Sequence, residues 1–138
     1  MRVTFGLLAG IGLLMALLLP VTATAKEEFK LSDVQYIPLQ PAFVANYGGP
    51  GRLKYLKTDI TLMVKNLAEQ QLVEGQLPLV RNSIILTLSR QNENNVTTSA
   101  GQERIRQQVL QAVNEALTRE IGQPLVHEVL FTNFIYQN

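Results

Sequence analysis

Residues 99–124 read SAGQERIRQQVLQAVNEALTREIGQP, and this stretch carries the clearest secondary-structure signal in the chain. Its apolar residues recur three or four positions apart, which is the spacing of one face of an α-helix. Ser99 and Gln102 are typical of a helix N-terminus, while Gly122 and Pro124 are typical of a helix end. The stretch therefore predicts an amphipathic helix, whose inner stripe comprises Ile105, Val109, Ala112, Val113, Ala116, Leu117 and Ile121.

Downstream of this helix, residues 125–137 are rich in β-branched and aromatic side chains, which predicts a closing β-strand. The large apolar residues of this stretch fall on both faces of an extended chain. A strand of that kind belongs inside a sheet or beneath a helix, because neither of its faces suits water. We therefore expect the chain to end on an inner strand that closes the sheet, the alternative being a strand donated to a neighbouring subunit through edge pairing.

Upstream, two further strands are expected on either side of a turn at residues 47–52, which holds three glycines and a proline. Residues 34–46 contain Pro38 and Pro41, and proline cannot donate a hydrogen bond to a neighbouring strand. This first strand is therefore predicted to be an edge strand or a bulged one. Residues 53–65 alternate between apolar and polar positions, which predicts a half-buried strand paired antiparallel with the first.

The middle of the chain is predicted to be helical. Asn66 with Glu69 is typical of a capped helix N-terminus, and Pro78 suits the first residue of a second helical segment. Residues 91–98 are predicted to form a polar loop before the long helix. This order of elements predicts an α+β fold, in which one antiparallel sheet packs on amphipathic helices. The inner face of the second segment consists of Leu77, Val80, Ile84 and Leu88.

The first 25 residues form a separate segment, because no charge occurs from Val3 to Ala25. Pro20 and the tripeptide Ala23-Thr24-Ala25 are typical of a signal peptide cleaved after Ala25. The apolar run is also long enough to span a bilayer as an uncleaved anchor. Both alternatives stay open, and both export the same domain. We expect a signal peptide or anchor at 1–25, a linker at 26–35 and one domain at 36–138.

The chemistry of the chain points away from catalysis. The sequence has no cysteine and one histidine, His127, and the formal net charge is +1. Within a strand, His127 and Glu128 point to opposite faces and cannot chelate one metal ion together. We find no candidate catalytic, cofactor-binding or metal-ligating residue, and the near-neutral charge gives no reason to expect nucleic-acid binding. A binding or structural module is therefore expected in place of an enzyme, with unknown binding residues.

Four stretches in order, GRLKYLKTDITLMV, LPLVRNSIILTLSRQ, SAGQERIRQQVLQAVNEAL and VLFTNFIYQ, resemble the flagellar basal-body-associated FliL family. The resemblance runs from about Tyr36 to Gln137, and the ending with Phe131, Thr132 and Phe134 is its most specific part. It implies a single-pass inner-membrane protein whose periplasmic domain is similar to the stomatin/prohibitin fold. It implies no enzymatic activity and no cofactor.

The resemblance also implies partners. Members of the family assemble into rings around flagellar stator units and support motility, torque or rotation during chemotaxis. The expected partners are therefore further copies of this chain and the stator or basal-body proteins, with the membrane as a third partner if the N-terminal segment is uncleaved. The alternative is a soluble periplasmic binding or adaptor protein, released by cleavage at Ala25, that keeps the fold without the anchor.

Overall fold

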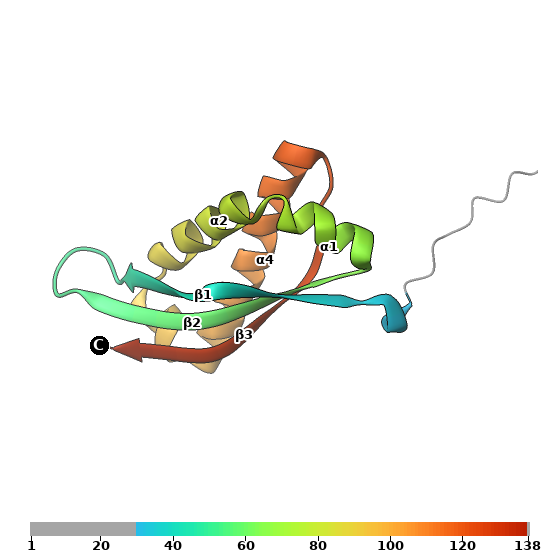
Figure 1. The fold of residues 1–138 in the computed structure, drawn as a ribbon. Coiled ribbons are helices and arrows are strands. Elements are labelled where there is room, and N and C mark those ends of the chain that lie inside the picture. The colour runs from blue at the N-terminus through green and yellow to red at the C-terminus, as the bar shows by residue number, and fades with distance from the viewer. Residues whose placement is uncertain (1–29, 138) are drawn as a thin grey trace, which may run out of the picture.

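The computed structural model describes residues 30–137, so the expected signal peptide or anchor at 1–25 lies outside the described residues. Among the described residues, no helix is both long enough and apolar enough to cross a membrane. A 3₁₀ turn precedes the first strand, and an α+β domain follows (Figure 1). Its elements are η1 (Leu31–Asp33), β1 (Gln35–Tyr47), β2 (Lys54–Val64), α1 (Leu67–Glu74), α2 (Leu77–Ser89), α3 (Glu93–Thr97), α4 (Ser99–Ile121) and β3 (Val126–Gln137).

The three strands form one antiparallel sheet in the order β1-β2-β3, which confirms the predicted hairpin and fold class. The hairpin turn contains Gly48, Gly49 and Gly51, all with positive φ, a backbone conformation that residues other than glycine rarely adopt. The first strand is bulged between Leu39 and Phe43, where the Gln40–Pro41 peptide is cis. The prediction of a bulged or edge strand at the prolines is thus confirmed on both counts.

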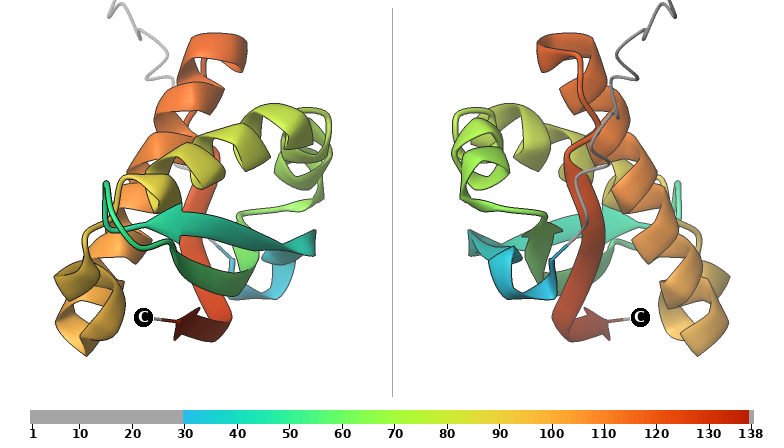
Figure 2. Two further views of the ribbon diagram at one scale, coloured as in Figure 1. Left: turned by 90° about the vertical axis from the view of Figure 1, so that its left-hand side faces the viewer. Right: turned by 90° about the vertical axis from the view of Figure 1, so that its right-hand side faces the viewer.

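Helices α1, α2 and α4 gather over one face of the sheet, as the two views of Figure 2 show. The core lies between the layers, and the strands alternate accordingly. Alternate side chains of β2, from Leu56 through Thr58 to Val64, are buried beneath the helices, while those between them are partly or fully exposed on the helix-free face. The predicted inner stripe of α4 is confirmed, with Ile105, Val109, Val113 and Leu117 fully buried. This stripe forms part of the core between the helices and the sheet, whereas Ala112 and Ile121 are only partly buried.

The prediction that the closing strand is an inner strand is wrong. β2 is the central strand, and β3 lies at one edge of the sheet within the described domain. Only its first half is deeply covered, because Val126 and Val129 are buried whereas Ile135 is 61% exposed. The apolar residues of its outer face therefore remain at the surface. The large apolar residues on both faces of this strand indicated that both faces are buried. Within the described domain, however, no second strand lies along the outer edge of β3.

Residues 91–98 were predicted to be a polar loop, and the structure corrects this. They contain the short helix α3, whose N-cap Asn92 accepts a hydrogen bond from the Asn95 backbone N–H at 2.8 Å. Gln91 is buried and donates to the Gln108 side chain at 2.7 Å. This hydrogen bond joins the start of the segment to α4. The structure also places the cap of α4 one residue earlier than predicted, since Thr98 accepts from the Gly101 N–H.

Two other predicted helix ends are confirmed. Asn66 caps α1 by accepting from the Glu69 N–H at 2.9 Å, and the Glu69 carboxylate accepts from the Lys65 N–H at 2.8 Å. Gly122 ends α4 in the left-handed conformation, with φ of 78°. Pro78 lies in the first turn of α2, one residue after the helix begins at Leu77. Local sequence signals thus define most of the element boundaries.

Candidate functional site

The one histidine lies on the surface at the start of β3. His127 Nε2 is 3.6 Å from Glu69 Oε2, and the side chain is 40% exposed. Glu128, its neighbour in the chain, pairs across the sheet with Met63 on the helix-free face. Over residues 30–137, no group of three or more histidine or acidic side chains is close enough together to hold a metal ion. His127 can therefore pair with Glu69 when it is charged.

The serine hydroxyls of α2 are engaged in hydrogen bonds of the helix itself. Ser83 Oγ donates to the Leu79 carbonyl at 3.0 Å, and Ser89 Oγ donates to the Ile85 carbonyl at 2.8 Å. Bonds of this kind satisfy the hydroxyl locally and leave it no base that could activate it. The distinctive surfaces of the domain are instead the two edges of its sheet.

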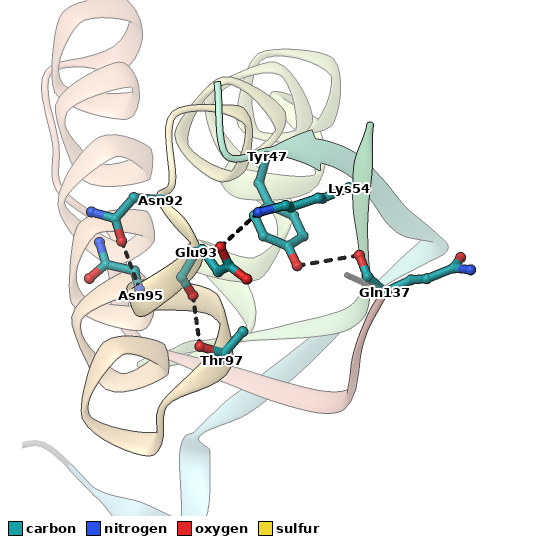
Figure 3. A network of polar contacts seen from close by, with 7 residues as sticks. All are labelled: Tyr47, Lys54, Asn92, Glu93, Asn95, Thr97 and Gln137. Carbon is teal, nitrogen blue, oxygen red and sulfur yellow. Dashed lines mark hydrogen bonds and ion pairs between the residues drawn. The ribbon is translucent and has the colours of Figure 1, made fainter. Parts of the chain in front are cut away.

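A polar cluster at the hairpin end of the domain ties these edges together (Figure 3). Lys54 Nζ, at the start of β2, is 2.7 Å from Glu93 Oε2, at the start of α3. The Tyr47 hydroxyl, from the end of β1, donates to the Gln137 carbonyl at the end of β3 at 3.4 Å. Burial raises the pKa of the Tyr47 hydroxyl, so it stays protonated and able to donate. The Tyr47 hydroxyl therefore links the ends of β1 and β3, and the Lys54–Glu93 ion pair links β2 to α3.

Helix α4 covers the first half of the β3 edge. Asn114 Nδ2 donates to the Val126 carbonyl at 2.7 Å, and the Val126 N–H donates to Asn114 Oδ1 at 3.0 Å. The side-chain amide thus replaces the neighbouring strand that this residue would otherwise need. Three residues further along, Arg106 Nη1 donates to the Val129 carbonyl at 3.4 Å.

Arg106 is itself held by Glu103. The guanidinium Nε donates to Glu103 Oε2 at 2.7 Å, and Nη2 donates to the other carboxylate oxygen. The hydrogen bonds from Arg106, and then from Gln107, lower the pKa of the Glu103 carboxyl to about 2. The paired charges keep the guanidinium in place above the β3 edge across the neutral pH range.

The second half of the β3 edge carries no such cover. Among residues 30–137, no hydrogen bond connects the backbone of residues 130–136 to an element outside the sheet. The side chains there are large and apolar: Phe131 and Phe134 stack with ring centroids 5.7 Å apart, and Tyr136 is 39% exposed. Residues 130–137 contain no charged side chain. An open, uncharged strand edge is a ready template for another strand.

The opposite edge, formed by β1, is open in a similar way. Its first half contains Pro38 and Pro41, but residues 43–47 have no proline. Between this half and α2 runs a groove of about 480 Å³, lined by residues 44–47, Gly49, Leu53, Ile85 and Ser89. Val44 is 59% exposed and Ile85 is 40% exposed, so the groove offers apolar side chains beside the polar ones of Asn46 and Ser89.

Arg81 lies one turn before Ile85 on α2, at the bulged part of β1. Its guanidinium carbon is 4.2 Å from the centroid of the Phe43 ring, and Nη1 is buried without a hydrogen-bond partner. The cation–π contact with the Phe43 ring therefore stabilises the charge of the Arg81 guanidinium. Sequence reasoning identified neither this residue nor Asn114 as part of a surface. Only the prolines of β1 gave a signal that an edge was present.

The site and the fold together define a small α+β domain whose distinguishing surfaces are two open sheet edges. The chain belongs to the FliL family, because residues 36–137 match the family described as flagellar basal body-associated protein FliL. It is similar to the flagellar protein FliL of Aquifex aeolicus (strain VF5), with 34% identity over 99 residues. The match covers 72% of this chain and 59% of that relative, so this chain spans somewhat more than half of the relative's length. The family predicted from the four motifs is confirmed.

Proposed function

We propose that this protein is an accessory component of the bacterial flagellar motor, which self-associates and contacts stator units to support motility and rotation. The observation that supports the proposal is the family match, which spans 102 positions, from 36 to 137, and thus nearly the whole described domain. The two open sheet edges support the self-association, because each offers backbone groups and apolar side chains to a neighbour. In this proposal the protein catalyses no reaction and acts by binding other copies of itself and the stator units.

Deleting the gene tests the motor role, provided that swimming and filament formation are scored separately. The proposal predicts normal filaments with impaired swimming, restored by a plasmid copy of the wild-type gene. Loss of the filaments as well would indicate a role in flagellar assembly instead. Unchanged swimming in the deletion strain, with no second family member encoded in the genome, would overturn the proposal.

The location in the cell is part of the same proposal. We place the domain in the periplasm, tethered to the inner membrane by the segment at 1–25. The alternative, a soluble periplasmic adaptor, is favoured by Pro20 and the Ala23-Thr24-Ala25 tripeptide. Fractionation separates the two: a membrane-bound protein with an intact N-terminus supports the anchor, and a periplasmic protein beginning at Lys26 supports the adaptor.

A further inference from the structure

The open parts of the two sheet edges lie at the same level. Val44 of β1 pairs with Lys57 of β2, and Lys57 pairs in turn with Ile135 of β3. The next rows are Ala45 with Leu56 and Tyr136, and Asn46 with Tyr55 and Gln137. In Figure 1, β1 and β3 accordingly both end beside the hairpin turn, on either side of β2. The half of each edge at the other end is closed, by proline in β1 and by α4 in β3.

We propose that copies of this chain associate head to tail, with the end of β3 from one copy adding to the end of β1 of the next. This inference rests on the self-association in the proposed function and assigns a surface to it. β1 and β3 are each antiparallel to β2, so they are parallel to each other. A neighbour shifted sideways across the sheet, without being reversed, therefore presents its β3 parallel to β1. Because both open edges lie at one level, the repeat needs no shift along the strands, and a head-to-tail repeat of that kind can close into a ring.

The groove beside β1 suits the side chains that such a strand brings. Ile135 lies on the helix-free face, in the same row as Val44, so the two exposed apolar side chains of adjacent copies meet there. Tyr136 lies on the opposite face, because it pairs with the buried Leu56. The aromatic ring of the incoming strand is therefore on the side of the groove formed by Ile85 of α2. Main-chain hydrogen bonds and alternate side-chain contacts are the usual means by which a strand is added to an edge.

The symmetric alternatives fit less well. Pairing of two β1 edges about a two-fold axis leaves the exposed Ile135 at the end of β3 without a neighbour. Pairing of two β3 edges meets the bulge at Asn133, which has φ of 54° and lies where the register with β2 shifts. The head-to-tail arrangement covers Ile135, and it pairs residues 134–137, which lie beyond the bulge.

Disulfide crosslinking in the full-length protein tests this arrangement, and the absence of native cysteine makes the result specific. Adjacent strands are about 4.8 Å apart, within the Cα separation of about 4.4–6.8 Å that a disulfide requires. Val44→Cys and Ile135→Cys, each alone, should stay monomeric after mild oxidation, and co-expression of the two should give a crosslinked dimer. The double variant carrying both cysteines should give a ladder of higher multimers.

Tyr36→Cys provides the matched control, because Tyr36 is also on the helix-free face of β1 and 55% exposed, but lies at the closed end of the strand. Combined with Ile135→Cys, it should give no dimer. Crosslinking of Val44→Cys alone would show β1 pairing with β1, and crosslinking of Ile135→Cys alone would show β3 pairing with β3. Either result, or no crosslink in the mixture, would overturn the proposal.

Ile135→Lys gives an independent readout through assembly. It should lower the assembled fraction in sedimentation while leaving the melting temperature unchanged, because the side chain is exposed in the single chain. An unchanged assembled fraction would count against the interface. The motor role and the interface can fail separately. If the deletion strain swims poorly but the cysteine variants give no crosslink, the proposed interface is wrong and the motor role stands. If the cysteine variants give the multimer ladder but the deletion strain swims normally, the motor role is wrong and the interface stands.

Discussion

Replacing Asn114 with alanine removes the side chain that pairs with both backbone groups of Val126. Its amide accepts from the Val126 N–H at 3.0 Å and donates to the Val126 carbonyl at 2.7 Å. Val126 is only 3% exposed, so water has little access to the groups left behind. Leaving two buried backbone groups unpaired costs about 2–4 kcal/mol. Alanine returns about 0.5 kcal/mol through its higher helix propensity. The free energy of unfolding should therefore fall by roughly 1.5–3.5 kcal/mol.

Thermal unfolding followed by circular dichroism measures this effect. At roughly 4 °C per kcal/mol for a domain of this size, Tm should fall by about 6–14 °C. Gln111→Ala is the matched control, because Gln111 is an exposed residue of the same helix and its amide donates a hydrogen bond to the Glu115 side chain at 2.9 Å. Its effect should stay within about 0.5 kcal/mol. Amide hydrogen exchange at Val126 should accelerate in Asn114→Ala and not in the control. Equal stability of the two variants would refute the role assigned to Asn114.

Three further changes probe the core, a close contact and a titration. Val113→Asp places a charge at a fully buried position of the α4 stripe, so stability should fall by about 3–5 kcal/mol in urea unfolding; an unchanged midpoint would disprove the stripe. Gly101→Ala brings a Cβ to 2.4 Å from the Asn95 Cα and carbonyl oxygen, so α3 must move and stability should drop by about 1–3 kcal/mol; a stabilised variant would contradict the contact. Carboxyl NMR should show Glu103 titrating near its pKa of about 2, and Arg106→Gln should raise that pKa toward the ordinary 4.5. Because the pKa of Glu103 is lowered in the folded state, the stabilisation from its pair with Arg106 is present at neutral pH and is lost as pH falls from about 4.5 through about 2. If Arg106→Gln leaves the titration midpoint of Glu103 unchanged, the hydrogen bond from Arg106 is not the cause of the low pKa.

The local elements of the fold could be predicted from the sequence because each is encoded within a few residues. The buried stripe of α4 follows from apolar residues one turn apart, and the end of that helix follows from Gly122, which adopts positive φ without strain. The alternation of β2 indicated its buried face in the same way. The family, too, could be recognised from motifs read in order along the chain, and the comparison confirmed it.

Short polar segments were harder to interpret. Residues 91–98 have the composition of a loop, yet they form α3, which is capped by Asn92 and joined to α4 by the hydrogen bond from the buried Gln91 to Gln108. The cap of α4 could be Ser99 or Thr98, since both hydroxyls are suitable, and the packing of Gly101 against Asn95 accompanies the choice of Thr98. In both cases, the packing of residues 91–98 against α4 accompanies a choice that the local composition left open.

The sequence alone determined the fold class, the order of the elements apart from η1 and α3, the buried face of the long amphipathic elements and the family. Only the tertiary structure decided where the closing strand lies in the sheet and which parts of its two edges stay open. The alternation of a strand records which faces avoid water, but it contains no information about which strand lies alongside. The position of β3 at the edge depends on its pairing with β2, more than 60 residues earlier in the chain, and on Asn114 of α4, which replaces the next strand at Val126. Those are long-range contacts, and they exist only once the helices and the sheet have packed together.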